Sequence, residues 1–145
     1  MKRYLLPLLV LAATSCASRG TPEEEVRAVF AAAEAAAEAR DTSDAMSLVA
    51  DDYSDDNGFD KNGLQHFVRA YFLSRPSLTV LLRVESVEFP ADDLAQATIT
   101  LVVLGRESTG AGDGARFAAN GQRYRVELVR EDGNWRLRHT SRVTD

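Results

Sequence analysis

The spacing of apolar residues changes once along this chain, near Leu78, and the change restricts the folds that the chain can adopt. Before Leu78, apolar residues recur every three or four positions, as on one face of a helix. After it, they alternate with polar residues, as in strands that are covered on one side. The predicted helices therefore all precede the predicted strands. This order predicts an α+β fold in which helices cover one face of an antiparallel sheet.

The first helix is predicted to begin at Thr21. Thr21 is a favourable N-cap residue, Pro22 suits the first helical position, and Glu24 completes a capping box. One face of this helix carries an apolar stripe: Val26, Val29, Phe30, Ala33 and Ala37. Residues 31–39 consist of alanine and glutamate, so their short side chains allow another element to approach closely.

Two more helices are predicted before the strands. A short one covers about 44–50, after a break at 41–43, and a polar loop or short extended stretch follows at 51–58. The third helix covers 61–73, where apolar residues repeat at helical spacing: Leu64, Phe67, Val68, Tyr71 and Phe72.

Four strands are predicted, at 78–89, 95–104, 122–130 and 135–143. A change of alternation near Glu85 predicts a β-bulge in the first of them, and residues 131–134 have the composition of a hairpin turn. Strict alternation in the last strand would place Trp135, Leu137, His139, Ser141 and Val143 on one face and Arg136, Arg138 and Arg142 on the other.

The first sixteen residues have the layout of an export signal. A basic start is followed by an apolar run at 5–11 and by small residues at 12–15, which lead to Cys16, the only cysteine. The run is too short to span a bilayer, which takes about 20 apolar residues. Residues 13–16, Ala-Thr-Ser-Cys, resemble the lipobox of bacterial lipoproteins, in which the peptide is cut before the cysteine and the cysteine is lipidated.

This resemblance implies three parts: a signal peptide at 1–15, a lipidated tether at 16–20 and a folded domain at 21–145. Lipid on Cys16 would anchor the domain to a membrane. Because Ala17 rather than aspartate follows the cysteine, the resemblance implies the outer membrane, with the domain on its periplasmic face. An ordinary cleaved signal peptide with a stray cysteine is the alternative.

The charge and the residue spacings exclude several classes of partner. Removing residues 1–15 takes away two basic residues and no acidic one, so 15 basic residues remain against 22 acidic ones. This balance argues against binding nucleic acid. No Cys/His spacing suggests a metal site, and the acidic cluster at 51–60 fails the spacing of a calcium-binding EF-hand loop. No metal and no cofactor are expected.

The order of elements resembles the NTF2-like (SnoaL-like) superfamily over roughly residues 21–143. Two segments carry the resemblance: Leu-Val-Ala-Asp-Asp-Tyr at 48–53 and Glu-Asp-Gly-Asn-Trp-Arg-Leu at 131–137. It implies three helices packed on the concave face of a curved, mainly antiparallel sheet, a cystatin-like cone with a pocket inside. The family includes isomerases, dehydratases and hydrolases beside non-catalytic binding domains, so the fold does not choose a function.

Five positions are implied to line that pocket: Phe30, Tyr53, Tyr71, Trp135 and His139. Packing in the core would equally account for the aromatic residues. His139 is expected on the apolar face of the last strand, either as a general acid or base or as a histidine satisfied by a neighbouring hydrogen bond.

Asp55 and Asp56 lie where ketosteroid-isomerase-like members of the family carry a catalytic aspartate, and the sequence does not decide between them. Those enzymes also use a hydroxyl donor from an early helix to stabilise an oxyanion. The first helix here offers no such donor.

The interpretation that these observations favour is an envelope-anchored lipoprotein whose non-catalytic domain binds a small apolar ligand or a partner protein. One alternative is a small pocket enzyme of isomerase, dehydratase or hydrolase type that uses His139 with Asp55 or Asp56. Another is an accessory subunit of an envelope complex, which would use the arginines expected on the exposed sheet face: Arg123, Arg125, Arg136, Arg138 and Arg142. The ligand, the partner, the oligomeric state and the order of segment 105–114 stay open.

Overall fold

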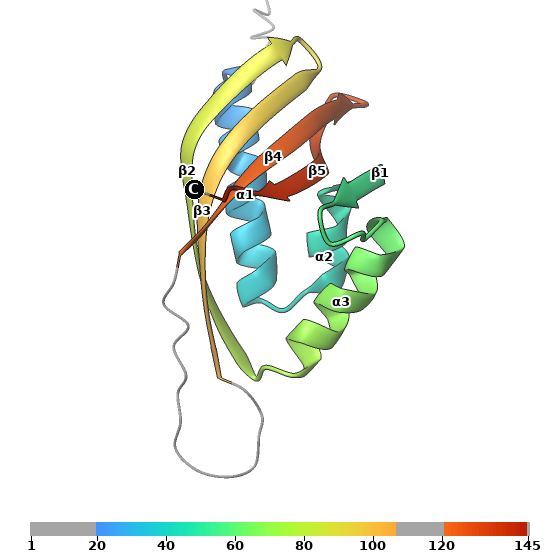
Figure 1. Cartoon of the computed structure of the whole chain (residues 1–145), viewed down its shortest axis with the longest axis vertical. Helices are drawn as coiled ribbons and strands as arrows, with labels where there is room; N and C mark the ends of the chain where they lie inside the picture. The colour runs from blue at the N-terminus through green and yellow to red at the C-terminus, as the bar shows by residue number, and fades with distance from the viewer. Residues whose placement is uncertain (1–19, 107–120, 145) are drawn as a thin grey trace, which may run out of the picture.

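The computed structural model describes residues 20–106 and 121–144. The elements follow the order α1 (Pro22–Glu38), α2 (Thr42–Ser47), β1 (Val49–Asp55), α3 (Lys61–Leu73), β2 (Ser77–Ala91), β3 (Leu94–Arg106), β4 (Gln122–Glu131) and β5 (Asn134–Arg142). The strands form one sheet in the order β1-β5-β4-β3-β2, in which β1 and β5 run parallel and the other neighbours antiparallel. Figure 1 shows a strongly curved sheet with the helices on its concave side, which is the predicted α+β cone. The predicted signal peptide, Cys16 and most of segment 105–114 lie outside the described residues.

Helices α1 and α3 begin at the predicted residues. Thr21 accepts a hydrogen bond from Glu24 N at 3.3 Å and donates its own N–H to Glu24 Oε2 at 2.9 Å, so the predicted capping box opens α1. Helix α3 covers the predicted residues 61–73. Helix α2 begins earlier than predicted because Asp41 caps it, accepting from Asp44 N at 2.9 Å.

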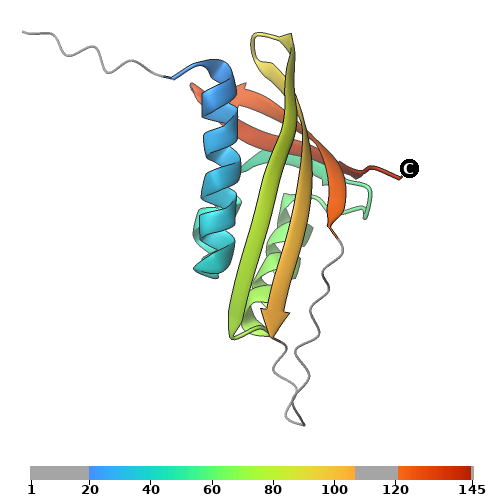
Figure 2. The same cartoon turned by 90° about the vertical axis from the view of Figure 1, so that its left-hand side faces the viewer.

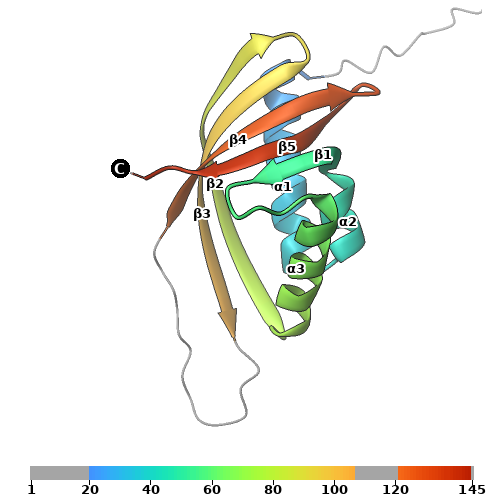
Figure 3. The same cartoon turned by 45° about the vertical axis from the view of Figure 1, so that its right-hand side comes forward.

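Residues 49–55 form strand β1, where the sequence predicted the end of a helix and then a loop or short extended stretch. Val49, Ala50 and Tyr53 are buried within it. The strand forms because β5, far along the chain, supplies its pairing partner; Leu137 N, for example, donates to Leu48 O at 2.8 Å. Figure 3 shows β1 beside β5, with α2 and α3 next to it.

Strands β2 and β3 form a long hairpin. Its register shifts between Val84 and Ser86, which confirms the bulge predicted near Glu85. The β4–β5 hairpin turns at Asp132 and Gly133, both with positive φ (49° and 79°), as a type I′ turn requires.

The described residues form two buried apolar clusters. The larger packs α1 against the sheet and includes Val26, Phe30, Ala97, Leu128 and Trp135. The smaller lies under α2 and β1 and consists of Met46, Val49 and Tyr53, with Leu64 of α3 packed against it. Within the described residues, no helix is long and apolar enough to cross a membrane.

Helix α1 also covers the free edge of β2, as Figure 2 shows. Leu82 N donates to Glu34 Oε2 at 3.1 Å, and Val80 N donates to Glu38 Oε1 at 3.2 Å. Four residues of helix rise about 6 Å and two residues of strand about 6.7 Å, so the two carboxylates match the spacing of the two amides. The helix therefore satisfies backbone groups that an edge strand leaves unpaired.

Candidate functional site

A cavity of about 420 Å³ lies between α1, α3 and the concave face of the sheet. We call it the cone cavity. Its walls include Ala33 and Ala37 of α1, Phe67 and Tyr71 of α3, and aliphatic side chains of β2 and β3. Phe67 is 50% exposed while it lines the cavity, so the cavity reaches the surface beside α3.

The short side chains of α1 leave this space open. Ala33 and Ala37 are four residues apart and lie on one face of the helix. The sequence suggested that another element packs closely against this part of the helix. Instead, Ala33 and Ala37 face the cavity.

The wall on α3 is aromatic. The rings of Phe59 and Phe67 have centroids 5.5 Å apart, and those of Phe67 and Tyr71 are 5.9 Å apart. The guanidinium carbon of Arg75 lies 3.7 Å from the centroid of the Tyr71 ring. Of these groups, Phe67 and Tyr71 line the cavity, and Phe59 and Arg75 pack against them from outside the lining.

Few polar groups line the cone cavity. Glu34 is its one carboxylate among the described residues, and that carboxylate already accepts the amide of Leu82. The hydroxyl groups of Tyr71 and Tyr124 also belong to the lining. Across residues 20–106 and 121–144, no group of three or more His, Cys, Asp and Glu side chains is arranged to hold a metal ion.

A second bulge, in β5, decides which side chains face the cavity. Leu128 pairs with Leu137 while the adjacent Glu127 pairs with His139, which leaves Arg138 as an extra residue in β5. Two residues of β5 thus oppose one residue of β4, and the alternation of faces reverses after the bulge.

The reversal corrects the predicted faces of three residues: Ser141, which pairs with Arg125 on the outer face, His139 and Arg142. His139 pairs with Glu127 on the outer face and so does not share the face of Trp135 and Leu137, contrary to the prediction from strict alternation. Arg142 pairs with Tyr124, a residue that lines the cone cavity, so it lies on the concave face rather than with the outer arginines.

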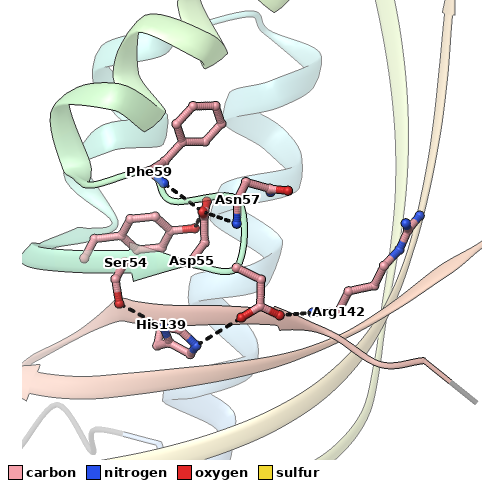
Figure 4. A network of polar contacts seen from close by, with 8 residues as sticks. Ser54, Asp55, Asn57, Phe59, His139 and Arg142 are labelled. Atoms are coloured by element: carbon pink, nitrogen blue, oxygen red, sulfur yellow. Dashed lines mark hydrogen bonds and ion pairs between the residues drawn. The ribbon is translucent and has the colours of Figure 1, made fainter.

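His139 lies in a polar group outside the cone cavity, shown in Figure 4. Its Nδ1 is 2.9 Å from Ser54 Oγ, its Nε2 is 3.8 Å from Asp56 Oδ1, and its side chain is 42% exposed. Of the two candidate aspartates, it is Asp56 that meets His139. Asp56 Oδ2 also accepts the backbone amide of Arg142 at 3.2 Å.

Asp55 organises the loop that follows β1. Its Oδ1 accepts the amides of Asn57 (2.9 Å) and Phe59 (3.0 Å), and its Oδ2 accepts the Tyr53 hydroxyl at 3.1 Å. Burial raises the pKa of Tyr53 to about 12. These bonds occupy both carboxylate oxygens of Asp55 in local structure.

The residues expected to line the pocket lie in several places. Tyr71 lines the cone cavity. Phe30 is buried in the core and borders a separate cavity of about 390 Å³ against β2. Trp135 borders a groove of about 770 Å³ beside the β4–β5 turn, and its Nε1 donates to Glu25 Oε2 at 3.2 Å. Tyr53 belongs to the smaller core cluster, and His139 lies on the outer face.

Most of the expected outer arginines are paired with carboxylates. Arg123 binds Glu85 at 3.0 Å. Arg138 lies 3.3 Å from Asp52 and 3.8 Å from Glu127. Arg136 Nε lies 3.9 Å from a carboxylate oxygen of Glu131. These carboxylates neutralise much of the charge on this face.

Sequence reasoning missed Glu34 of the cavity lining and placed Arg142 on the wrong face of the sheet. The spacing of Glu34 and Glu38 on an otherwise alanine-rich face was a visible signal for the first. Nothing in the local pattern signals the bulge that turns Arg142 inward, because the bulge depends on pairing with β4.

A sequence model of the family described as the SnoaL-like domain matches residues 19–141 of this chain. Curated protein sequences gave no match. Among solved structures, the chain is similar to a candidate scytalone dehydratase from Novosphingobium aromaticivorans, with a TM-score of 0.73 and 11% identity over 85% of this chain and 83% of that one.

Two further structures show the same fold. A candidate dehydratase of the NTF2-like family from Streptomyces avermitilis has a TM-score of 0.66 and 17% identity over 85% of this chain and 97% of that one. A Nostoc punctiforme domain of unknown function with a cystatin-like fold has a TM-score of 0.66 and 13% identity, covering 88% and 80% of the two chains.

Proposed function

Because the chain belongs to the SnoaL-like domain family, whose NTF2-like fold encloses a cone, we propose that it binds a small apolar ligand in the cone cavity without transforming it. The observation that carries this proposal is the cavity itself: about 420 Å³, between α1, α3 and the sheet, and walled mainly by apolar side chains. This volume falls within the range of about 300–1,000 Å³ found for small-molecule pockets.

The polar groups of the lining favour binding over catalysis. General acid–base chemistry needs a titratable side chain within hydrogen-bond reach of the reacting group. The carboxylate of Glu34 is already engaged with the edge of β2, and the remaining titratable groups of the described lining are tyrosine hydroxyls.

The enzymatic alternative rests on His139 with Asp56. Two structurally similar proteins are named as candidate dehydratases, which keeps this alternative open at the level of fold. However, His139 and Asp56 meet on the outer side of β5, where His139 pairs with Glu127. Neither residue belongs to the lining of the cone cavity, so we favour the binding function.

A fluorescent probe tests the binding function. N-phenyl-1-naphthylamine is uncharged and fluoresces strongly in apolar surroundings, so the purified protein should enhance its emission saturably. Ala37→Leu, which adds three carbon atoms to the cavity wall, should weaken binding about tenfold or more. Ala35→Leu makes the same change at an exposed position of the same helix and is the matched control.

The two variants separate a cavity site from surface adsorption. Equal loss of binding in Ala35→Leu and Ala37→Leu would contradict a site in the cone cavity. A folded protein that does not enhance the probe's emission at all would overturn the proposed function.

We also propose that lipid on Cys16 anchors the domain at the periplasmic face of the outer membrane. The support is the sequence pattern at 1–16. Cells grown with an alkyne analogue of palmitate should label the wild-type protein in the membrane fraction, and Cys16→Ser should abolish the label. Exported wild-type protein that is unlabelled and recovered with soluble proteins would support an ordinary signal peptide instead.

A further inference from the structure

The bulge in β5 places an exposed cation, Arg142, on the concave face next to a residue that lines the cone cavity. Arg142 pairs with Tyr124, and Tyr124 lines the cavity. Gln122, two residues before Tyr124 on β4, pairs with Leu101, another lining residue. Directly paired residues of antiparallel strands point to the same face, so these side chains share the concave face.

Contacts at both ends hold Arg142 in place. Its backbone amide donates to Asp56 Oδ2 at 3.2 Å, and its Nη2 donates to Gln122 Oε1. Figure 4 shows the side chain of Arg142 extending away from His139. The partner of the guanidinium is therefore a neutral amide, and its side chain forms no ion pair within the described part of the chain.

This pairing differs from that of the outer arginines. Arg123, Arg136 and Arg138 each face a carboxylate within 4 Å. Arg142 has no carboxylate partner among the described residues, so several of its guanidinium N–H donors stay available for a planar anion.

The opposite side of the cavity carries a negative charge. Glu34 lies at the edge of β2, while Arg142 is on β5, and three strand spacings of about 4.8 Å each separate these strands. An anionic group in the cavity would thus be repelled from the α1 side and attracted to the β5 side. The charges define one orientation for an elongated, amphipathic anion.

We propose that the ligand of the cone cavity is an amphipathic anion, with its apolar body against Phe67 and Tyr71 and its carboxylate or sulfonate on Arg142. Gln122 is a positioning residue that holds the guanidinium on the concave face. This proposal rests on the proposed function of the cavity as a site for an apolar body, and it adds one anionic group at the end of the ligand nearest Arg142.

A matched pair of probes tests it. 1-Anilinonaphthalene-8-sulfonate has the same rings as N-phenyl-1-naphthylamine and adds one sulfonate, so the ratio of the two affinities isolates the contribution of the anion. The purified protein should bind the sulfonate probe more tightly than the neutral one. Arg142→Gln should lower that ratio about tenfold, and added salt should lower it in the wild type.

Arg125→Gln is the matched control. Arg125 is exposed, lies on the outer face of β4 opposite Ser141, and its loss changes the net charge by the same amount. It should leave the affinity ratio unchanged. If Arg142→Gln and Arg125→Gln lower the ratio equally, or if neither does, the assignment of the anion to Arg142 is wrong.

The outcomes separate this inference from the proposed function. If the neutral probe does not bind, the proposed apolar site is wrong, and the anion site fails with it. Binding of the neutral probe together with a ratio that does not depend on Arg142 leaves the apolar site standing and overturns the anion site alone.

Discussion

Replacing Glu34 by alanine should destabilise the fold through the edge of β2. The carboxylate accepts the Leu82 amide at 3.1 Å, and Leu82 lies on β2, the edge strand of the sheet that the described residues form. Alanine has the highest helix propensity, so the change does not weaken α1 itself. The loss of stability should come from the amide that is left without a partner.

The magnitude follows from burial and charge. A hydrogen bond to a charged group contributes about 1.5–3 kcal/mol. Glu34 is half-buried, so solvent weakens the bond and the lower end applies, about 1.5 kcal/mol. Glu38 is exposed, so Glu38→Ala should cost about 0.5 kcal/mol.

Urea unfolding measures the difference. The protein has one tryptophan, Trp135, which is buried, so its fluorescence reports the unfolding of the sheet. Glu34→Ala should lower the urea midpoint by about 1 M, given a slope of 1–3 kcal/mol per M. Glu34→Gln, which retains an oxygen acceptor, should recover part of the loss.

Glu88→Ala is the control, because Glu88 lies exposed on β2 and its side chain forms no hydrogen bond within the described residues. It should change stability by less than about 0.5 kcal/mol. The reasoning about the strand edge fails if Glu34→Ala costs no more than Glu88→Ala.

Two further predictions concern the buried phenol and the hairpin turn. Burial raises the pKa of Tyr53 from 10.0 to about 12, so the unfolded chain loses this proton first and the stabilising contribution, complete below pH 10, is lost as the pH rises towards 12. Tyr53→Phe should therefore show a shallower loss of stability in this window, measured by urea unfolding at a series of pH values; a slope equal to that of the wild type would contradict the assignment. Gly133→Ala should cost about 1 kcal/mol from the positive φ alone, since a Cβ at Gly133 would meet no atom within 4 Å. Asp132→Asn, which suits the same turn type, should be neutral. Thermal unfolding of the wild type and the two variants measures both effects, and equal midpoints for all three proteins would refute the turn assignment.

The sequence predicted correctly the features that depend on residues close to one another in the chain. The capping box at Thr21 and Glu24, the third helix at 61–73 and the turn at Asp132 and Gly133 all depend on contacts within a few residues. Helical and strand periodicity then indicated the order of elements, and the order indicated an α+β cone, which the structure confirms.

The tertiary structure alone decided which side chains enter the cavity. Strand β1 exists because β5 pairs with it, and polar residues at 51–56 gave little sign of that partner. The extra residue Arg138 in β5 moves His139 to the outer face and Arg142 to the concave face. Since side chains alternate every residue in a strand, one unpaired residue reverses every position after it. The sequence by itself therefore determined the elements and their order, while the pairing of strands distant in the chain decided the chemistry of the site.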